Sequence, residues 1–175
     1  MQHRAKRYIW GRVKAVAILS MAIMIACHHA QKGEVVLSRQ QIDHATSGLR
    51  EAYAAFNRGD IDAAVRILDP EVEWIEPPEF PGGGTYHRVD GARQYLAQSR
   101  AGAAEVISEP EQFIPAGNRI IVFVHARVLP KGSYTWQHVR LADVYTFQNG
   151  RAIHMRAFGN RDDALQWAGV TAHPR

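Results

Sequence analysis

Apolar residues recur at steps of three and four over residues 39–57. The recurring positions are Ile42, Ala45, Leu49, Tyr53 and Phe56. This spacing places them on one stripe of an amphipathic helix. Ser38 and Gln41 have the capping-box spacing that marks a helix start. Gly59 fits the left-handed position that ends a helix, so the pattern predicts a helix over about 39–57.

A second helix and a strand are predicted directly afterwards. Asp60 can cap the segment "IDAAVRIL", which Pro70 prevents from continuing as a helix. The following "EVEWIEP" alternates, so Val72, Trp74 and Glu76 share one face of a strand. Pro77 and Pro78 end that strand.

The loop "PEFPGGGTYHRVDG" contains three consecutive glycines. It lacks both the Gly-Lys-Ser/Thr of a phosphate-binding loop and a strand leading into G-x-G-x-x-G, so the glycines indicate turns. Asp90 can cap a third helix, "GARQYLAQSR", with Tyr95 and Leu96 facing inward.

The second half of the chain is rich in β-type segments. Strands are predicted near 106–114, 119–128, 134–147 and 152–158, joined by "PAGN", "LPKGS" and "QNG". Asn149-Gly150 is a strong hairpin signal, and such short connections require antiparallel pairing. The run 134–147 is long enough to require a strong bend or a bulge. Asn160 caps a last helix, which Gly169 ends.

This order predicts an α+β fold, in which helices cover one face of a curved antiparallel sheet. A bent sheet closed by helices forms a cone with an interior pocket, the usual setting of a small-molecule site. We expect one domain over 38–172, preceded by an extension over 1–37.

The net charge of +4 is unevenly distributed. Residues 1–40 hold seven basic residues against one acidic residue, whereas residues 41–175 hold 14 basic and 16 acidic residues. The predicted domain is therefore mildly acidic, which argues against nucleic acid as a partner.

The N-terminal segment has the layout of a secretory signal, with basic residues followed by "AVAILSMAIMIA" and Cys27. The tetrapeptide ending at Cys27 resembles the lipobox of bacterial lipoproteins, although Met24 replaces the usual Leu. The alternatives are a buried apolar helix or an upstream segment included through a wrongly chosen start codon. If residues 1–27 are a true signal, the protein is exported or is a membrane-anchored lipoprotein that contacts the membrane only through this segment. Otherwise the protein is cytoplasmic. Three adjacent residues, Cys27, His28 and His29, cannot converge on one ion, so no metal is expected.

Three segments carry a family resemblance. "LREAYAAFNRGDIDAAVRILDPEVEW", "PGGGTYHRVDGARQYL" and "DVYTFQNGRAIHMRAF" are similar to segments of SnoaL-like proteins in the nuclear transport factor 2-like (NTF2-like) superfamily. That superfamily includes ketosteroid isomerases, polyketide cyclases and limonene epoxide hydrolases. The resemblance covers about 42–170 and implies the cone. It leaves function open, because this cone hosts enzymes, ligand binders and association domains.

The resemblance implies two candidate catalytic carboxylates. Asp143 matches the acid/base of the pattern D-[IV]-[FY]-x-[FI]-x-x-G-[KR] in the cyclases, and Glu76 lies near the position of the isomerase base. Alternation places both among apolar or aromatic neighbours, where desolvation raises a carboxyl pKa. The alternative for Asp143 is a structural ion pair with Arg127, Arg140 or Arg156. The alternative for Glu76 is a carboxylate at the rim.

Five further residues are candidates for the pocket lining. They are Tyr53, Trp74, His125, Tyr145 and Arg156. Tyr53 and Tyr145 can donate a hydrogen bond to an oxyanion, and Arg156 can pair with Asp143 or a ligand carboxylate. The alternative for Tyr53 and Tyr145 is a role as aromatic residues of the core. The alternative for His125 is a histidine whose hydrogen bonds are purely structural.

The leading hypothesis is a small-molecule-binding protein whose cone holds a compact, largely apolar ligand. It includes cofactor-free isomerase, cyclase or hydrolase chemistry through Asp143. The alternative is a non-catalytic ligand carrier or association domain, tethered to a membrane through Cys27. We expect no cofactor. We also expect a homodimer that forms through the sheet face.

Overall fold

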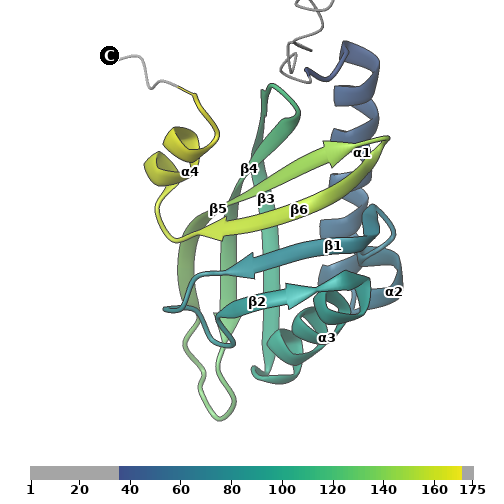
Figure 1. Ribbon diagram of the computed structural model, residues 1–175. Helices are drawn as coiled ribbons and strands as arrows, with labels where there is room; N and C mark the ends of the chain where they lie inside the picture. Colours follow the sequence, from purple (N-terminus) through teal and green to yellow (C-terminus); the bar gives the residue numbers. More distant parts are fainter. Residues whose placement is uncertain (1–35, 171–175) are drawn as a thin grey trace, which may run out of the picture. The chain divides into compact units, whose positions relative to one another are not determined.

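The computed structural model describes residues 36–170, which contain four helices and six strands (Figure 1). In chain order these are α1 (Arg39–Asn57), α2 (Ile61–Ala64), β1 (Leu68–Glu76), β2 (Gly84–His87), α3 (Arg88–Ala101), β3 (Glu105–Ala116), β4 (Arg119–Leu129), β5 (Gln137–Gln148), β6 (Arg151–Phe158) and α4 (Arg161–Trp167). No helix in this part of the chain is long and apolar enough to cross a membrane.

The strands form one curved sheet in the order β2-β1-β6-β5-β4-β3. The predicted antiparallel pairing is confirmed for β3 to β6. The sheet is mixed, however, because β1 pairs in parallel with β6. A strand from the N-terminal half thus lies beside the last strand of the chain, and this pairing completes the α+β fold.

The predicted start of the domain is confirmed at α1. Ser38 and Gln41 form both bonds of a capping box, and Gly59 adopts φ 84°. The Asp60 side chain caps α2, but this helix ends at Ala64 and not near residue 68. Pro70 lies within β1, where the register with β6 is interrupted between Leu68 and Glu73. A proline has no N–H for the ladder, so an interruption accommodates it.

The glycine-rich loop leads into a strand that the sequence pattern does not reveal. Strand β2 has only four residues and pairs with the end of β1. Gly83 is required by a close approach, because a Cβ there would lie 2.2 Å from the Pro77 carbonyl oxygen. Helix α3 begins at Arg88, so Asp90 lies in its first turn and is not its cap.

The hairpins of the second half are confirmed. Asn149 and Gly150 have φ values of 51° and 78°, as a two-residue hairpin turn requires. Strand β5 bends across the sheet (Figure 1). The bulge lies in β6 and not in β5: the register shift between the two strands leaves Ile153 of β6 without a partner in β5.

The helices do not all cover one face of the sheet. Leu49 and Tyr53 of α1 pack with Tyr145 and Phe147 in the main core. In contrast, Ala164 of α4 packs against the opposite side of β5 in a second cluster. The run "IIVFV" (Ile120–Val124) in β4 is apolar at successive positions, so both faces of the sheet need covering there.

Candidate active site

A cavity of about 550 Å³ lies between the sheet and helices α1 and α3. Apolar side chains from all these elements form most of its wall, including Phe56, Leu68, Leu96, Val124 and Leu141. The polar side chains are fewer: Tyr53, Glu76, Tyr95, Gln98, Ser99, Ser108, Asp143 and Tyr145. An apolar hollow with a few convergent polar groups is typical of a small-molecule site.

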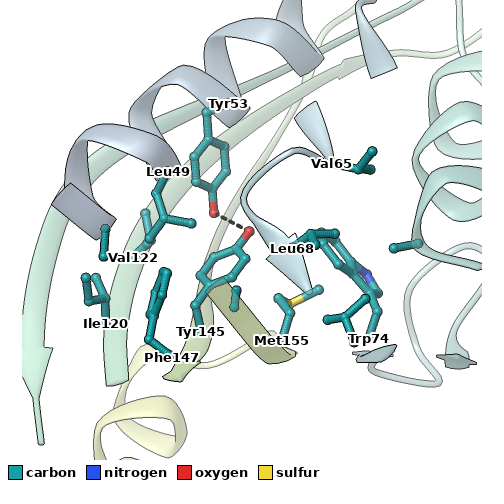
Figure 2. Packing of buried hydrophobic residues seen from close by; sticks show 14 of the residues in the cluster. Leu49, Tyr53, Val65, Leu68, Trp74, Ile120, Val122, Tyr145, Phe147 and Met155 are labelled. Atoms are coloured by element: carbon teal, nitrogen blue, oxygen red, sulfur yellow. Dashed lines mark hydrogen bonds between the residues drawn. The ribbon is translucent and has the colours of Figure 1, made fainter. Parts of the chain in front are cut away.

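Three hydroxyl and carboxyl groups form a chain of hydrogen bonds inside the cavity. Tyr53 Oη of α1 donates to Asp143 Oδ2 of β5 at 2.5 Å. Tyr145 Oη, two residues along β5, donates to Tyr53 Oη at 3.4 Å (Figure 2). The inward stripe of α1 and the inward parity of β5 bring these groups together although they are 90 residues apart in the sequence.

Asp143 is half-buried, and the exposed part of its side chain faces the cavity. Desolvation raises the pKa of this carboxyl to about 6, although the hydrogen bond from Tyr53 lowers it. The predicted alternative, a structural ion pair of Asp143 with Arg127, Arg140 or Arg156, does not occur among the described residues. Arg127 bonds Glu109, Arg140 lies 3.9 Å from Glu111, and Arg156 lies over the Phe158 ring.

Glu76 is the one charged residue among the buried side chains of the described region, with 6% exposed. It is therefore no rim carboxylate. Trp74 Nε1 donates to Glu76 Oε1 at 2.7 Å. Desolvation and, to a smaller extent, the charge of Asp143 raise the pKa of Glu76 to about 8, although hydrogen bonding by Trp74 and Tyr95 lowers it.

Aromatic rings surround the two carboxyl groups. The Trp74 ring lies 6.3 Å from that of Tyr145 in an edge-on arrangement and 6.2 Å from that of Tyr95. Tyr95 in turn lies 5.0 Å from Tyr86. Burial and the nearby carboxylates raise the pKa of Tyr53, Tyr95 and Tyr145, so these hydroxyls stay protonated and act as donors.

The structure brings together five of the predicted site residues: Asp143, Glu76, Tyr53, Trp74 and Tyr145. It places the other two elsewhere, which corrects the expectation that they line the cavity. His125 is paired across the ladder with Arg140, on the outer face, and its Nε2 lies 2.9 Å from His138 Nδ1. Arg156 is on the same outer face, opposite Val144.

Tyr95 is a site residue that the sequence pattern does not single out. The pattern predicts only that it faces inward from the third helix. The helical spacing predicts which face of the helix Tyr95 occupies. It does not predict that Tyr95 lies near Glu76, because that depends on the packing of α3 against β1.

The two carboxyl groups of the site differ in proton affinity. Between pH 6 and 8, Asp143 is mainly ionised while Glu76 is mainly protonated, so one can accept a proton and the other can donate one. No group of three metal-ligating side chains occurs in residues 36–170. Cys27, the predicted lipidation site, lies outside the described residues.

The SnoaL-like domain family model matches residues 49–155, which run from the second half of α1 into β6. The chain belongs to the SnoaL-like domain family. The match also spans all five residues that the structure brings together in the cavity. No curated protein matches the chain.

Solved structures show the same fold. An NTF2-like protein of unknown function from Burkholderia pseudomallei is 27% identical, with a TM-score of 0.61, over 74% of this SnoaL-like chain and 98% of its own. TerC, co-crystallized with polyporic acid, is 22% identical, with a TM-score of 0.60, over 72% and 98% of the two chains. A hypothetical protein from Catenulispora acidiphila with a ketosteroid isomerase-like fold, in complex with trimethylamine, is 14% identical, with a TM-score of 0.58, over 73% and 97%.

Proposed function

We propose that this SnoaL-like protein binds a compact, largely apolar small molecule in the cavity and catalyses a cofactor-free proton transfer on it. Isomerisation, cyclisation and hydration are reactions of this kind. The observation that carries the proposal is Asp143: a carboxylate in an apolar cavity, bonded by the Tyr53 hydroxyl at 2.5 Å and not neutralised by arginine. A carboxylate held in this way exchanges protons near neutral pH.

The proposed step uses both carboxyl groups. Asp143 removes a proton from the carbon next to a carbonyl group, and the bonding electrons move toward the carbonyl oxygen. Glu76, protonated at neutral pH, donates its proton to that oxygen, so that an enol forms. In a substrate with a β,γ double bond, Asp143 returns its proton to the γ-carbon of the dienol while the enol hydroxyl returns its proton to Glu76. This restores the carbonyl group and both carboxyl groups and completes an isomerisation. The buried hydroxyl of Tyr145 can stabilise the developing oxyanion.

Deuterium exchange tests the proposal with 2-tetralone, a compact ketone with exchangeable protons. In D₂O the wild-type protein is expected to accelerate exchange at the carbon next to the carbonyl, as followed by proton NMR. Asp143→Asn should reduce the rate by a factor on the order of 10²–10⁴. Glu111→Gln makes a similar change on the outer face and serves as the control.

Two results decide against this mechanism. An unchanged exchange rate in a folded Asp143→Asn protein would rule out Asp143 as the base. If wild type and Asp143→Asn bind the ketone equally and neither accelerates exchange, the non-catalytic ligand carrier is the better description of the protein.

Two expectations about assembly remain proposals. Export and lipidation at Cys27 would be supported by a membrane-bound mature chain with a lipid mass increment, lost in Cys27→Ala. An unlipidated, uncleaved soluble chain would contradict them. Sedimentation equilibrium tests the homodimer, and an Arg140→Glu change on the exposed outer face of β5 should weaken it if the sheet face is used.

A further inference from the structure

The acidic side chains of the cavity wall have no basic counterpart among the described residues. Glu76 and Asp143 both line the cavity, whereas none of the described residues that line it is Arg, Lys or His. Arg100 lies close by, over the Phe56 ring, but its guanidinium donates to the main-chain carbonyls of Phe56, Asn57 and Val106. Within residues 36–170, the two carboxyl groups therefore have no cationic side chain to neutralise them.

Both carboxyl groups are held only by neutral donors. Tyr53 bonds Asp143 and Trp74 bonds Glu76. Such donors fix the orientation of a carboxylate but leave its charge uncompensated in a poorly solvated space. A cation brought in by a ligand would pair with the ionised Asp143, whereas a ligand carboxylate would place a second negative charge beside Asp143 with no partner.

The aromatic wall favours the same kind of ligand. The centroid of the Trp74 ring lies 6.2 Å from that of Tyr95 and 6.3 Å from that of Tyr145. The two tyrosine rings are inclined to the Trp74 ring at 43° and 79°, respectively. All three residues line the cavity. An aromatic face attracts ammonium groups, most strongly where water is excluded.

We propose that the ligand of this cavity is an organic cation, an ammonium group carried on a compact apolar body. The ammonium group lies beside Asp143 and Glu76 and against the Trp74 and Tyr145 rings, and the apolar body fills the remainder of the cavity. This inference rests on the proposed small-molecule function and specifies its substrate class.

Equilibrium binding of unreactive probes tests the inference separately from catalysis. The probes are phenyltrimethylammonium, its neutral isostere tert-butylbenzene, and benzoate, each titrated at pH 7.5 against the full chain and followed by calorimetry. We expect the cation to bind at least about tenfold more tightly than the isostere, and benzoate to bind more weakly than either.

A double variant shows where the preference originates. Glu76→Gln with Asp143→Asn keeps the shape of the cavity and removes its charge. It should bind tert-butylbenzene as the wild type does, which also shows that it is folded, while the preference for the cation falls toward onefold to threefold. Glu111→Gln, the matched change on the outer face, should retain the full preference.

The outcomes separate the two proposals. If the isostere binds as tightly as the cation, the inference is wrong while the small-molecule site stands. A cation preference that survives in the double variant would likewise overturn it, because the carboxyl groups would not be its source. If no probe binds, both the inference and the proposed function are overturned.

Discussion

Acidic side chains on the two faces of the sheet have different hydrogen-bond donors. On the outer face, Glu109 accepts from Arg127 at 2.6 Å and Glu111 accepts from Arg161 at 2.5 Å. On the cavity face, Glu76 and Asp143 accept from an indole and a phenol. Both faces thus satisfy their carboxylates with hydrogen bonds, but only the outer face neutralises them.

The difference appears in their proton affinities. The hydrogen bond from Arg161 holds the pKa of Glu111 below its ordinary value, whereas desolvation raises that of Glu76 to about 8. The same residue type therefore serves a structural role on one face and is available for proton transfer on the other. Burial and the charge of the partner, more than the residue type, decide which role a carboxylate has.

The largest expected effect concerns stability against pH. The folded protein binds the Glu76 proton more tightly than the unfolded chain, whose Glu has a pKa near 4.5. Below pH 4.5, Glu76 is protonated in both states and does not change the free energy of unfolding. Between pH 4.5 and about 8 it ionises only in the unfolded chain, so the free energy of unfolding falls progressively. This amounts to a loss on the order of 4 kcal/mol. Urea unfolding of Glu76→Gln at pH 5, 7 and 9 should show a correspondingly smaller decline.

The outer face supplies the control for this measurement. Glu111→Gln should decline with pH over the same range as the wild type does, because the lowered pKa of Glu111 places its titration below that range. Equal slopes for wild type and Glu76→Gln would mean that Glu76 is not desolvated in solution.

A smaller effect is expected for Tyr53→Phe. This change removes the donor to Asp143 and should destabilise the protein by about 1.5–3 kcal/mol at pH 7.5, where the carboxylate is ionised. The pKa of Asp143 should move upward, because the bond from Tyr53 lowers it. Carbon-13 NMR of the Asp143 carboxyl group measures this, and a downward movement would contradict the assigned hydrogen bond.

Trp74→Phe should have a related but weaker effect. The ring remains, while the Nε1 donor to Glu76 is lost, at a cost of about 1–2 kcal/mol. The pKa of Glu76 should rise further, so the pH at which stability declines should move upward as well. An unchanged pH profile would show that the indole does not bond this carboxyl group.

The smallest effect is expected on the outer face at pH 7. Glu111 and Arg161 are both partly exposed, so Glu111→Gln should change the free energy of unfolding by only about 0–1 kcal/mol. A loss as large as that of Tyr53→Phe would remove the contrast between the two faces.

The inward parity of Asp143, Tyr145 and Glu76 could be predicted from the sequence, because polar residues interrupt these strands in alternation. The placement of His125 could not. It follows a run that is apolar at every position from Ile120 to Val124, so alternation does not say which parity faces the helices. Helix α4 makes both parities buried there, and its docking is a tertiary feature.

The partner of Asp143 was also beyond the reach of sequence patterns. Tyr53 lies on the inner stripe of α1, but its contact with a residue 90 positions away depends on how the helix crosses the sheet. Strand β2 was missed because four residues beside a glycine-rich turn give too short a pattern.

The parallel pairing of β1 with β6 bears on the order in which the protein is made and folds. Leu68 pairs with Ala152, so β1 leaves the ribosome long before its partner exists. Until then one of its edges has unpaired backbone groups, which invite contact with other chains. Closing so long a loop is also slow. The wall that carries Glu76 is therefore among the last parts of the molecule to form, and a nascent chain lacking β6 has no finished site.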